Sequence, residues 1–167
     1  MRSSATYIRN FIFGVEDSLV STVGLLTGVA IAGVPRDIII LTGVVLIIVE
    51  ALSMAAGSFL AEASTEEVKK RAGVSQRSVG GGAIMFVSYL FAGFVPLAPY
   101  FFATGMVALK LSVVASLAAL FVLGVMGGSL AGGYLVKRGL RIMLVGGIAI
   151  AAGVGAAVLL AHYGVAA

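Results

Sequence analysis

The chain has 167 residues, of which 60% are hydrophobic and 11% are charged, and its mean hydropathy is +1.16. This composition leaves too little polar surface to cover a water-soluble globule, so a soluble domain is excluded. The absence of cysteine excludes disulfides and thiolate metal sites, and the single histidine excludes a zinc site built on a pair of histidines. The net charge of +4 has to be explained by the positions of the basic residues.

Five apolar stretches are each long enough to cross a membrane as a helix. We therefore predict an all-α integral membrane protein that forms one transmembrane domain over residues 1–167. Residues 34–37 read as a tight turn, and 61–79 as the one long polar loop, while Pro96 and Pro99 are expected to end the third span. The predicted spans cover about residues 11–34, 38–60, 80–102, 111–129 and 142–162.

The basic residues are unevenly divided between the two sides of this topology. Nine lie on the side of the N-terminus and the 61–79 loop, against Arg36 and Lys110 on the other side. Basic loops stay in the cytosol, so the N-terminus is predicted to be cytosolic and the C-terminus outside. Topology thus explains the basic charge, and no nucleic-acid partner is expected. The nine are Arg2, Arg9, Lys69, Lys70, Arg71, Arg77, Lys137, Arg138 and Arg141.

Three acidic residues, Glu16, Asp17 and Glu50, lie inside predicted spans. Each costs about 2.5–3.5 kcal/mol to insert at the centre of a membrane helix, which favours a functional role. For Glu16 and Asp17 the alternative is a position near the cytosol, at the positive end of the helix dipole. Glu50 lies about 15 Å from the cytosolic end of its span, with no basic residue at that depth. It is expected to be protonated, to bond a hydroxyl such as that of Ser21 or Thr22, or to face a cation or a water-filled cavity.

Small and polar residues recur every three or four positions in the first span, at Gly14, Asp17, Ser21, Gly24 and Gly28. On a helix this spacing places them on one face. Small residues let membrane helices approach closely. We therefore expect this face to have a close neighbour and to lie at the centre of a homodimer.

In the second span Glu50 and Met54 share a helix face, and Ser53 borders it. Asp17 and Met54 each lie about 9 Å from the cytosolic end of their spans, at the same depth. A carboxylate, a thioether and hydroxyls suit a borderline transition metal such as Fe²⁺ better than Mg²⁺ or Ca²⁺. The alternative for Met54 is an ordinary filler of the apolar core.

Three segments resemble the vacuolar iron transporter family. The run F-G-V-E-D-S-L-V-S-T at 13–22 is similar to the first-helix pattern of the family, and S-M-A-A-G at 53–57 to its second-helix pattern. The third is P-L-A-P-Y at 96–100, after the third span. The resemblance implies a dimer of five-helix protomers in which metal crosses between the two first helices, past Asp17 and Met54. It also implies export of Fe²⁺ or Mn²⁺ from the cytosol in exchange for protons.

Plant members of that family carry a long cytosolic metal-binding insertion, whereas the predicted loop is short. Glu62, Glu66 and Glu67 are predicted to be its remnant and to receive metal from the cytosol, since 62 and 66 share a helix face. The alternative is a solvated, charge-balanced loop in which these acids lie beside the basic residues at 69–71.

The main hypothesis is a homodimeric, proton-coupled exporter of Fe²⁺ or Mn²⁺. Its predicted metal-binding residues are Asp17, Met54, Glu50 and Glu16, with Glu50 carrying the coupled proton, and Ser21 and Ser53 line the path. The alternative is a noncatalytic membrane subunit whose acidic helices pair with a partner protein. An enzyme and a resident cofactor are not expected, because Ser-His and Cys-His pairings are absent. The expected location is the cell membrane of a prokaryote, or a vacuolar or other organelle membrane in a eukaryote.

Overall fold

The computed structural model describes residues 2–68, 75–131 and 134–163, and over these ranges the chain is helical and has no strand. Five of the helices are long and apolar enough to cross a membrane. This confirms the prediction of an all-α protein with five spans. The helices are α1 (Arg2–Ile31), α2 (Arg36–Val68), α3 (Gln76–Leu97), the short α4 (Pro99–Phe102), α5 (Gly105–Ala131) and α6 (Leu135–His162).

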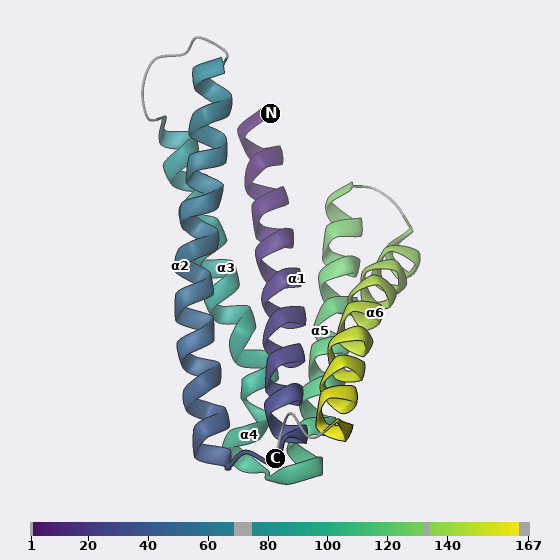
Figure 1. Cartoon of the computed structure of the whole chain (residues 1–167). Helices are drawn as coiled ribbons and strands as arrows, with labels where there is room; N and C mark the ends of the chain where they lie inside the picture. The colour runs from purple at the N-terminus through teal and green to yellow at the C-terminus, as the bar shows by residue number, and fades with distance from the viewer. Residues whose placement is uncertain (1, 69–74, 132–133, 164–167) are drawn as a thin grey trace.

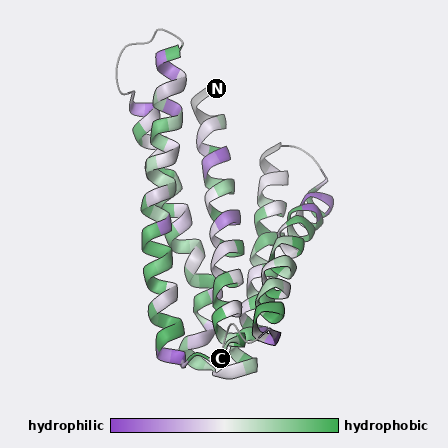
Figure 2. Ribbon diagram, viewed as in Figure 1, coloured by the Kyte–Doolittle hydropathy of each residue, from purple (hydrophilic) through white to green (hydrophobic). Residues whose placement is uncertain are grey.

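Helix α1 occupies the centre of the bundle, between a pair formed by α2 and α3 and a pair formed by α5 and α6 (Figure 1). The described ends of the chain lie at opposite ends of the bundle, as five crossings require. Figure 2 shows hydrophobic residues along the length of the helices and hydrophilic residues gathered mainly toward their ends. The two ends of the bundle are therefore suited to the two faces of a membrane.

The predicted loop at 61–79 is wrong for most of its length, because α2 continues to Val68 and α3 begins at Gln76. Residues 61–68 contain no glycine or proline and so continue the helix. With 33 residues α2 is roughly 50 Å long, against about 30 Å for the hydrocarbon core of a bilayer. Hydropathy predicts where a helix meets lipid, but it does not predict where the helix ends.

At the other end of the bundle, the chain turns near the residues that were expected, but the helix boundaries differ by a few residues from the prediction. Gly33 has a φ of +75°, a conformation that favours glycine, and α2 begins at Arg36. The Arg36 guanidinium donates through Nε to the carbonyl of Tyr100 at 2.6 Å and also bonds the carbonyl of Phe101. Pro96 lies inside the last turn of α3, so it does not end that helix, whereas Pro99 begins α4.

Helices α5 and α6 cross closely at Gly124. A Cβ atom added there would lie 2.6 Å from the Cα of Gly139 and 2.7 Å from the carbonyl oxygen of Arg138. Only a residue without a side chain permits this approach of two backbones. Toward the centre of the bundle, Leu120 of α5 and Ile150 of α6 pack against Leu19 of α1 in a buried apolar cluster.

Candidate functional site

Glu50 lies in a hydrogen-bonded cluster contributed by three helices. The Ser21 hydroxyl of α1 donates to Glu50 Oε2 at 3.0 Å, and the Tyr89 hydroxyl of α3 bonds the same oxygen. Ser21 Oγ and the Tyr89 hydroxyl lie 2.6 Å apart. Tyr89 is fully buried, and its carbonyl accepts a hydrogen bond of 2.7 Å from Ser18. Of the alternatives for Glu50, the structure therefore contains the bond to Ser21, whereas the Thr22 hydroxyl has no partner among the described residues.

This cluster lies within the apolar part of α2. Glu50 follows Arg36, the first residue of α2, by roughly 21 Å along the helix axis. The carboxyl group is half-buried between the helices. Its contacts join α1, α2 and α3 at one depth.

Met54 and Asp17 are placed differently from each other. Met54 lines a cavity of about 360 Å³ together with Asn10 and Phe13 of α1, and Asp17 does not line it. Asp17 is half-buried on α1. Over residues 2–68, 75–131 and 134–163, no group of three or more histidine, cysteine, aspartate or glutamate residues is placed to hold a metal. The described part of the chain therefore does not assemble the predicted ligands into one site.

Glu16 lies at a second cavity, which α1 lines together with Arg138 of α6. This cavity has a volume of about 490 Å³, and Glu16 lines it with Arg9, Phe13 and Arg138. Glu16 does not line the Met54 cavity and takes no part in the hydrogen bonds of the Glu50 cluster, although Arg9 and Phe13 line both cavities. The structure thus divides the four predicted metal-binding residues among different surroundings.

The small-residue face of α1 has close neighbours, as predicted, but they belong to the same chain. A Cβ at Gly14 would lie 2.3 Å from Ser88 Oγ of α3. Gly24 approaches Gly153 of α6, and Gly28 approaches Ala157. The small residues of α1 were the reason for placing α1 at the centre of a dimer, but they pack against α3 and α6 of the same chain. The dimer therefore stays a prediction.

Glu62 is bound in an ion-pair network instead of lying in a solvated loop. Its side chain is 9% exposed, and its carboxylate oxygens lie 2.7 Å from Arg77 Nε and 3.7 Å from Arg9 Nη2. Arg77 also donates to the Thr6 hydroxyl. Because two guanidinium groups neutralise this carboxylate, the expectation of a solvated loop is wrong here, and the predicted role in receiving metal has to compete with these pairs.

The other acids of this segment lie on the same helix. Glu66 is buried one turn beyond Glu62 on the same face of α2, and Glu67 is exposed. The basic residues at 69–71 that the alternative invoked lie outside the described residues. Ser53, predicted to line the path, is exposed on the surface of α2.

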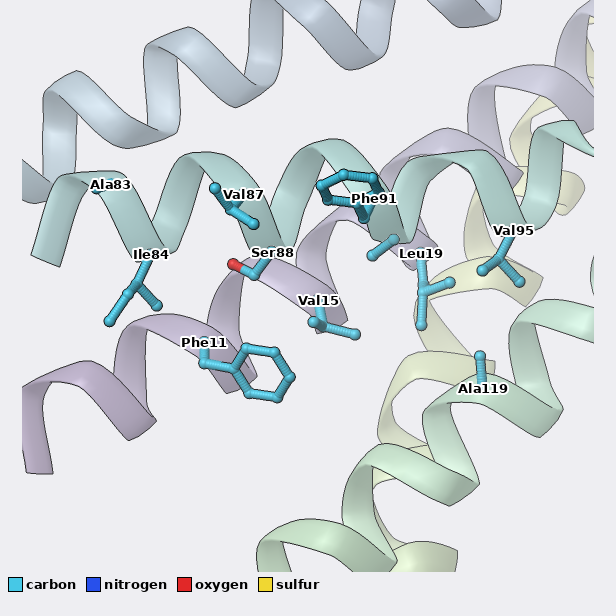
Figure 3. A pocket seen from close by; sticks show the side chains of 11 residues that line it. Phe11, Val15, Leu19, Ala83, Ile84, Val87, Ser88, Phe91, Val95 and Ala119 are labelled. Atoms are coloured by element: carbon cyan, nitrogen blue, oxygen red, sulfur yellow. The ribbon is translucent and has the colours of Figure 1, made fainter. Parts of the chain in front are cut away.

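A groove of about 640 Å³ between α1, α3 and α5 has a different character (Figure 3). Side chains of α1 and α3, with Ala119 of α5, line it, and all except that of Ser88 are apolar. The Ser88 hydroxyl already donates to the carbonyl of Met85 at 3.0 Å. Such a lining suits lipid chains or a helix face better than a hydrated ion.

Several residues of these clusters were not singled out from the sequence. Tyr89 and Met85 lie on the buried face of α3, and their helical spacing with Ser88 and Ala92 was the available signal. Asn10 donates to Ser58 Oγ at 2.8 Å and to the Gly81 carbonyl at 3.1 Å, and it carried no sequence signal.

These features define an integral multi-pass membrane protein whose spans hold polar and sulfur-bearing residues in their interior. The VIT family model matches residues 8–78 and 68–158, which together include all the polar clusters described above except Thr6. The chain therefore belongs to the VIT family, the vacuolar iron transporter family. Membership assigns the protein to the transport of metal ions across a membrane. Among curated proteins none matches the chain.

Proposed function

We propose that the protein is a homodimeric exporter that moves Fe²⁺ or Mn²⁺ out of the cytosol in exchange for protons. The observation that carries this proposal is the Glu50 cluster, a carboxyl group held by two hydroxyls at membrane depth in a chain of the VIT family. Carboxyl groups inside membrane spans are costly and typically serve ion or proton pathways.

The contacts of the cluster suit a group that gains and loses a proton. The hydroxyls of Ser21 and Tyr89 both contact the Glu50 carboxyl group and lie within hydrogen-bond distance of each other. A hydroxyl can donate as well as accept, so these two partners can serve either form of the carboxyl group. A cation nearby favours the ionised carboxylate, releases the proton and so couples metal movement to proton movement.

A two-fold arrangement supplies the missing metal ligands. Asp17 and Met54 of one protomer provide one carboxylate and one thioether, too few to replace the hydration shell of a metal. Two copies related by a two-fold axis double this set. Phe13 of α1, which lines the same cavity as Met54 and is 50% exposed, marks the face of α1 that the second copy covers.

Metal flux into proteoliposomes made from the purified protein tests the proposal. Vesicles with an acidic interior are expected to accumulate Fe²⁺ or Mn²⁺ and to ignore Mg²⁺ and Ca²⁺, because a mixed sulfur and oxygen site disfavours hard cations. Protein-free vesicles are the control. If the protein is inert alone and gains activity only with a second protein, the noncatalytic-subunit alternative holds instead.

The dimer has its own test, made simple by the absence of native cysteine. Ser53→Cys on the exposed surface of α2 is expected to give a disulfide-linked dimer in membranes under mild oxidation. Val114→Cys on the exposed surface of α5 is the matched control and should stay monomeric. Equal cross-linking at both positions would indicate random collision, and none at Ser53 would contradict a dimer that includes this face.

A further inference from the structure

The start of α6 gathers basic side chains around a cavity of about 420 Å³. It lies at the end of the bundle that also holds the N-terminus (Figure 1). Figure 2 shows this hydrophilic start of α6, followed by a mainly hydrophobic helix. Among the described residues, three basic side chains line the cavity and no acidic one does. The lining residues are Tyr134, Lys137, Arg138, Arg141 and Ile142.

The positive charge of this cavity is not neutralised by the described part of the chain. The ion pairs of that part are all formed by Glu62 on α2. Glu16 lines the neighbouring cavity with Arg138 but takes no part in those pairs. The Nζ atom of Lys137 lies 4.8 Å from the centre of the Tyr134 ring. An aromatic ring attracts a cation without cancelling its charge, so the cavity stays positive.

These positions are unfavourable for α6 itself. Lys137 and Arg138 follow closely on Leu135, the first residue of the helix, where the helix dipole disfavours cations. Arg141 lies four residues after Lys137 and three after Arg138, so like charges repel each other on one face. The first turn of α6 has no acidic residue that could offset these costs. A bound phosphate would relieve both, because helix N-termini and guanidinium groups bind phosphate favourably.

The surface of α6 that continues from the cavity is apolar and uncovered. Among the five spans, α6 is the least buried. Leu144, Val145 and Ile148 lie one to two turns beyond Arg141 on the same face, and they are 60%, 56% and 70% exposed. A ligand held by the basic residues would therefore meet a surface suited to hydrocarbon chains. A soluble anion would leave this surface unused.

From these features we infer that the start of α6 binds the phosphate headgroup of an anionic phospholipid. The lipid belongs to the membrane leaflet on the side of the N-terminus. Lys137, Arg138 and Arg141 hold the phosphate, and an acyl chain lies along the exposed apolar surface of α6. Basic pockets between membrane helices recognise anionic lipid headgroups in this way. The inference needs only a membrane-inserted bundle and does not depend on metal transport.

Native mass spectrometry of the full chain in detergent tests this site. The probes are phosphatidylglycerol and phosphatidylcholine with the same acyl chains, so that only the headgroup charge differs. The wild type is expected to bind phosphatidylglycerol more tightly. Lys137→Gln combined with Arg141→Gln should weaken that binding by about fivefold for each charge removed, the contribution of a basic residue near an anionic lipid surface. Both side chains are exposed, so this double variant should fold.

Lys69→Gln combined with Lys70→Gln is the matched control, because it removes the same charge from the segment between α2 and α3. Its binding of phosphatidylglycerol should equal that of the wild type. Equal weakening in both double variants would indicate general attraction to a basic protein and would overturn the inference, as would equal binding of the two lipids by the wild type. Displacement of the lipid by an equal concentration of glycerol phosphate would assign the cavity to a soluble phosphate instead.

Thermal unfolding gives a second readout. Without lipid, the Lys137→Gln and Arg141→Gln variant should be at least as stable as the wild type, because it relieves the repulsion within α6. Phosphatidylglycerol should raise the unfolding temperature of the wild type more than that of the variant. An equal rise in both proteins contradicts a lipid site at the start of α6.

Discussion

The two sides of the bundle around α1 are held together by different interactions. On the α2 and α3 side, hydrogen bonds and ion pairs cross between helices, as at Glu50 with Tyr89 and at Glu62 with Arg77. On the α5 and α6 side, no side-chain hydrogen bond among the described residues involves α6. Ser112 of α5, which donates to the Pro96 carbonyl at 2.7 Å, connects that side to α3.

The α5 and α6 side relies on shape instead. Gly124 meets the backbone of α6, and Gly139 and Gly146 accept the side chains of Phe121 and Leu120. In lipid the hydrophobic effect gives helices little reason to associate, so close packing supplies the attraction. The polar contacts between helices are thus concentrated on the α2 and α3 side, which includes the proposed transport residues. The α5 and α6 side supports the bundle through close packing.

The largest expected effect comes from breaking the packed support. Gly124→Leu places a side chain where the α6 backbone lies 2.6 Å from the added Cβ, so the two helices have to separate. Overpacking typically costs about 1–3 kcal/mol, and more where backbone blocks the side chain. We expect loss of the folded protein in detergent, measured by thermal unfolding and size-exclusion chromatography.

Gly155→Leu is the matched control on α6, because a Cβ there meets nothing within 4 Å. This variant should unfold at the same temperature as the wild type. If both glycine variants behave alike, the close crossing of α5 and α6 is not what holds this side together.

A smaller effect is expected at the ion pairs of the other side. Arg77→Gln leaves the Glu62 carboxylate with Arg9 at 3.7 Å, and should reduce the free energy of unfolding by about 1–3 kcal/mol. Arg9→Gln should cost less than about 1 kcal/mol, because Arg9 is exposed and its pair is longer. Chemical unfolding in detergent measures both. A loss of metal flux without loss of stability in Glu62→Gln would support the metal-receiving role instead.

The smallest effect on stability is expected at Glu50, where the change is functional. Glu50→Gln still accepts hydrogen bonds from Ser21 and Tyr89 but has no proton to release. We expect metal flux to lose its dependence on the pH gradient, a decrease of about tenfold under a strong gradient, or 1.4 kcal/mol. Asp17→Asn should reduce flux at every pH. Full pH-driven flux in Glu50→Gln would assign Glu50 a structural role and would weaken the division between the two sides.

Much of the fold could be predicted from the sequence, because five long apolar stretches in lipid have to be helices. The predicted ends were less accurate. The helix of α2 continues through Glu62 and Glu66, since polar residues with good helix propensity extend a helix into water without a hydropathy signal.

The candidate site, like the fold, could be predicted only in part from the sequence. Depth and charge indicated Glu50. Shared depth and ligand chemistry indicated Asp17 and Met54, and the motif resemblance agreed with them. Tyr89 and Met85 could not be assigned, because an aromatic residue and a methionine on an apolar helix resemble ordinary core residues until their neighbours are known.

The sequence by itself determined the class of protein, the number of crossings and the costly carboxylates, since each depends on the free energy of transferring residues from water to lipid. The tertiary structure decided which helix faces meet. In it the small residues of α1 pack against α3 and α6 of the same chain, and Glu50 forms hydrogen bonds with Ser21 and Tyr89. The physical reason is that one helix presents several faces of similar hydrophobicity, and only the fit between particular surfaces selects among them.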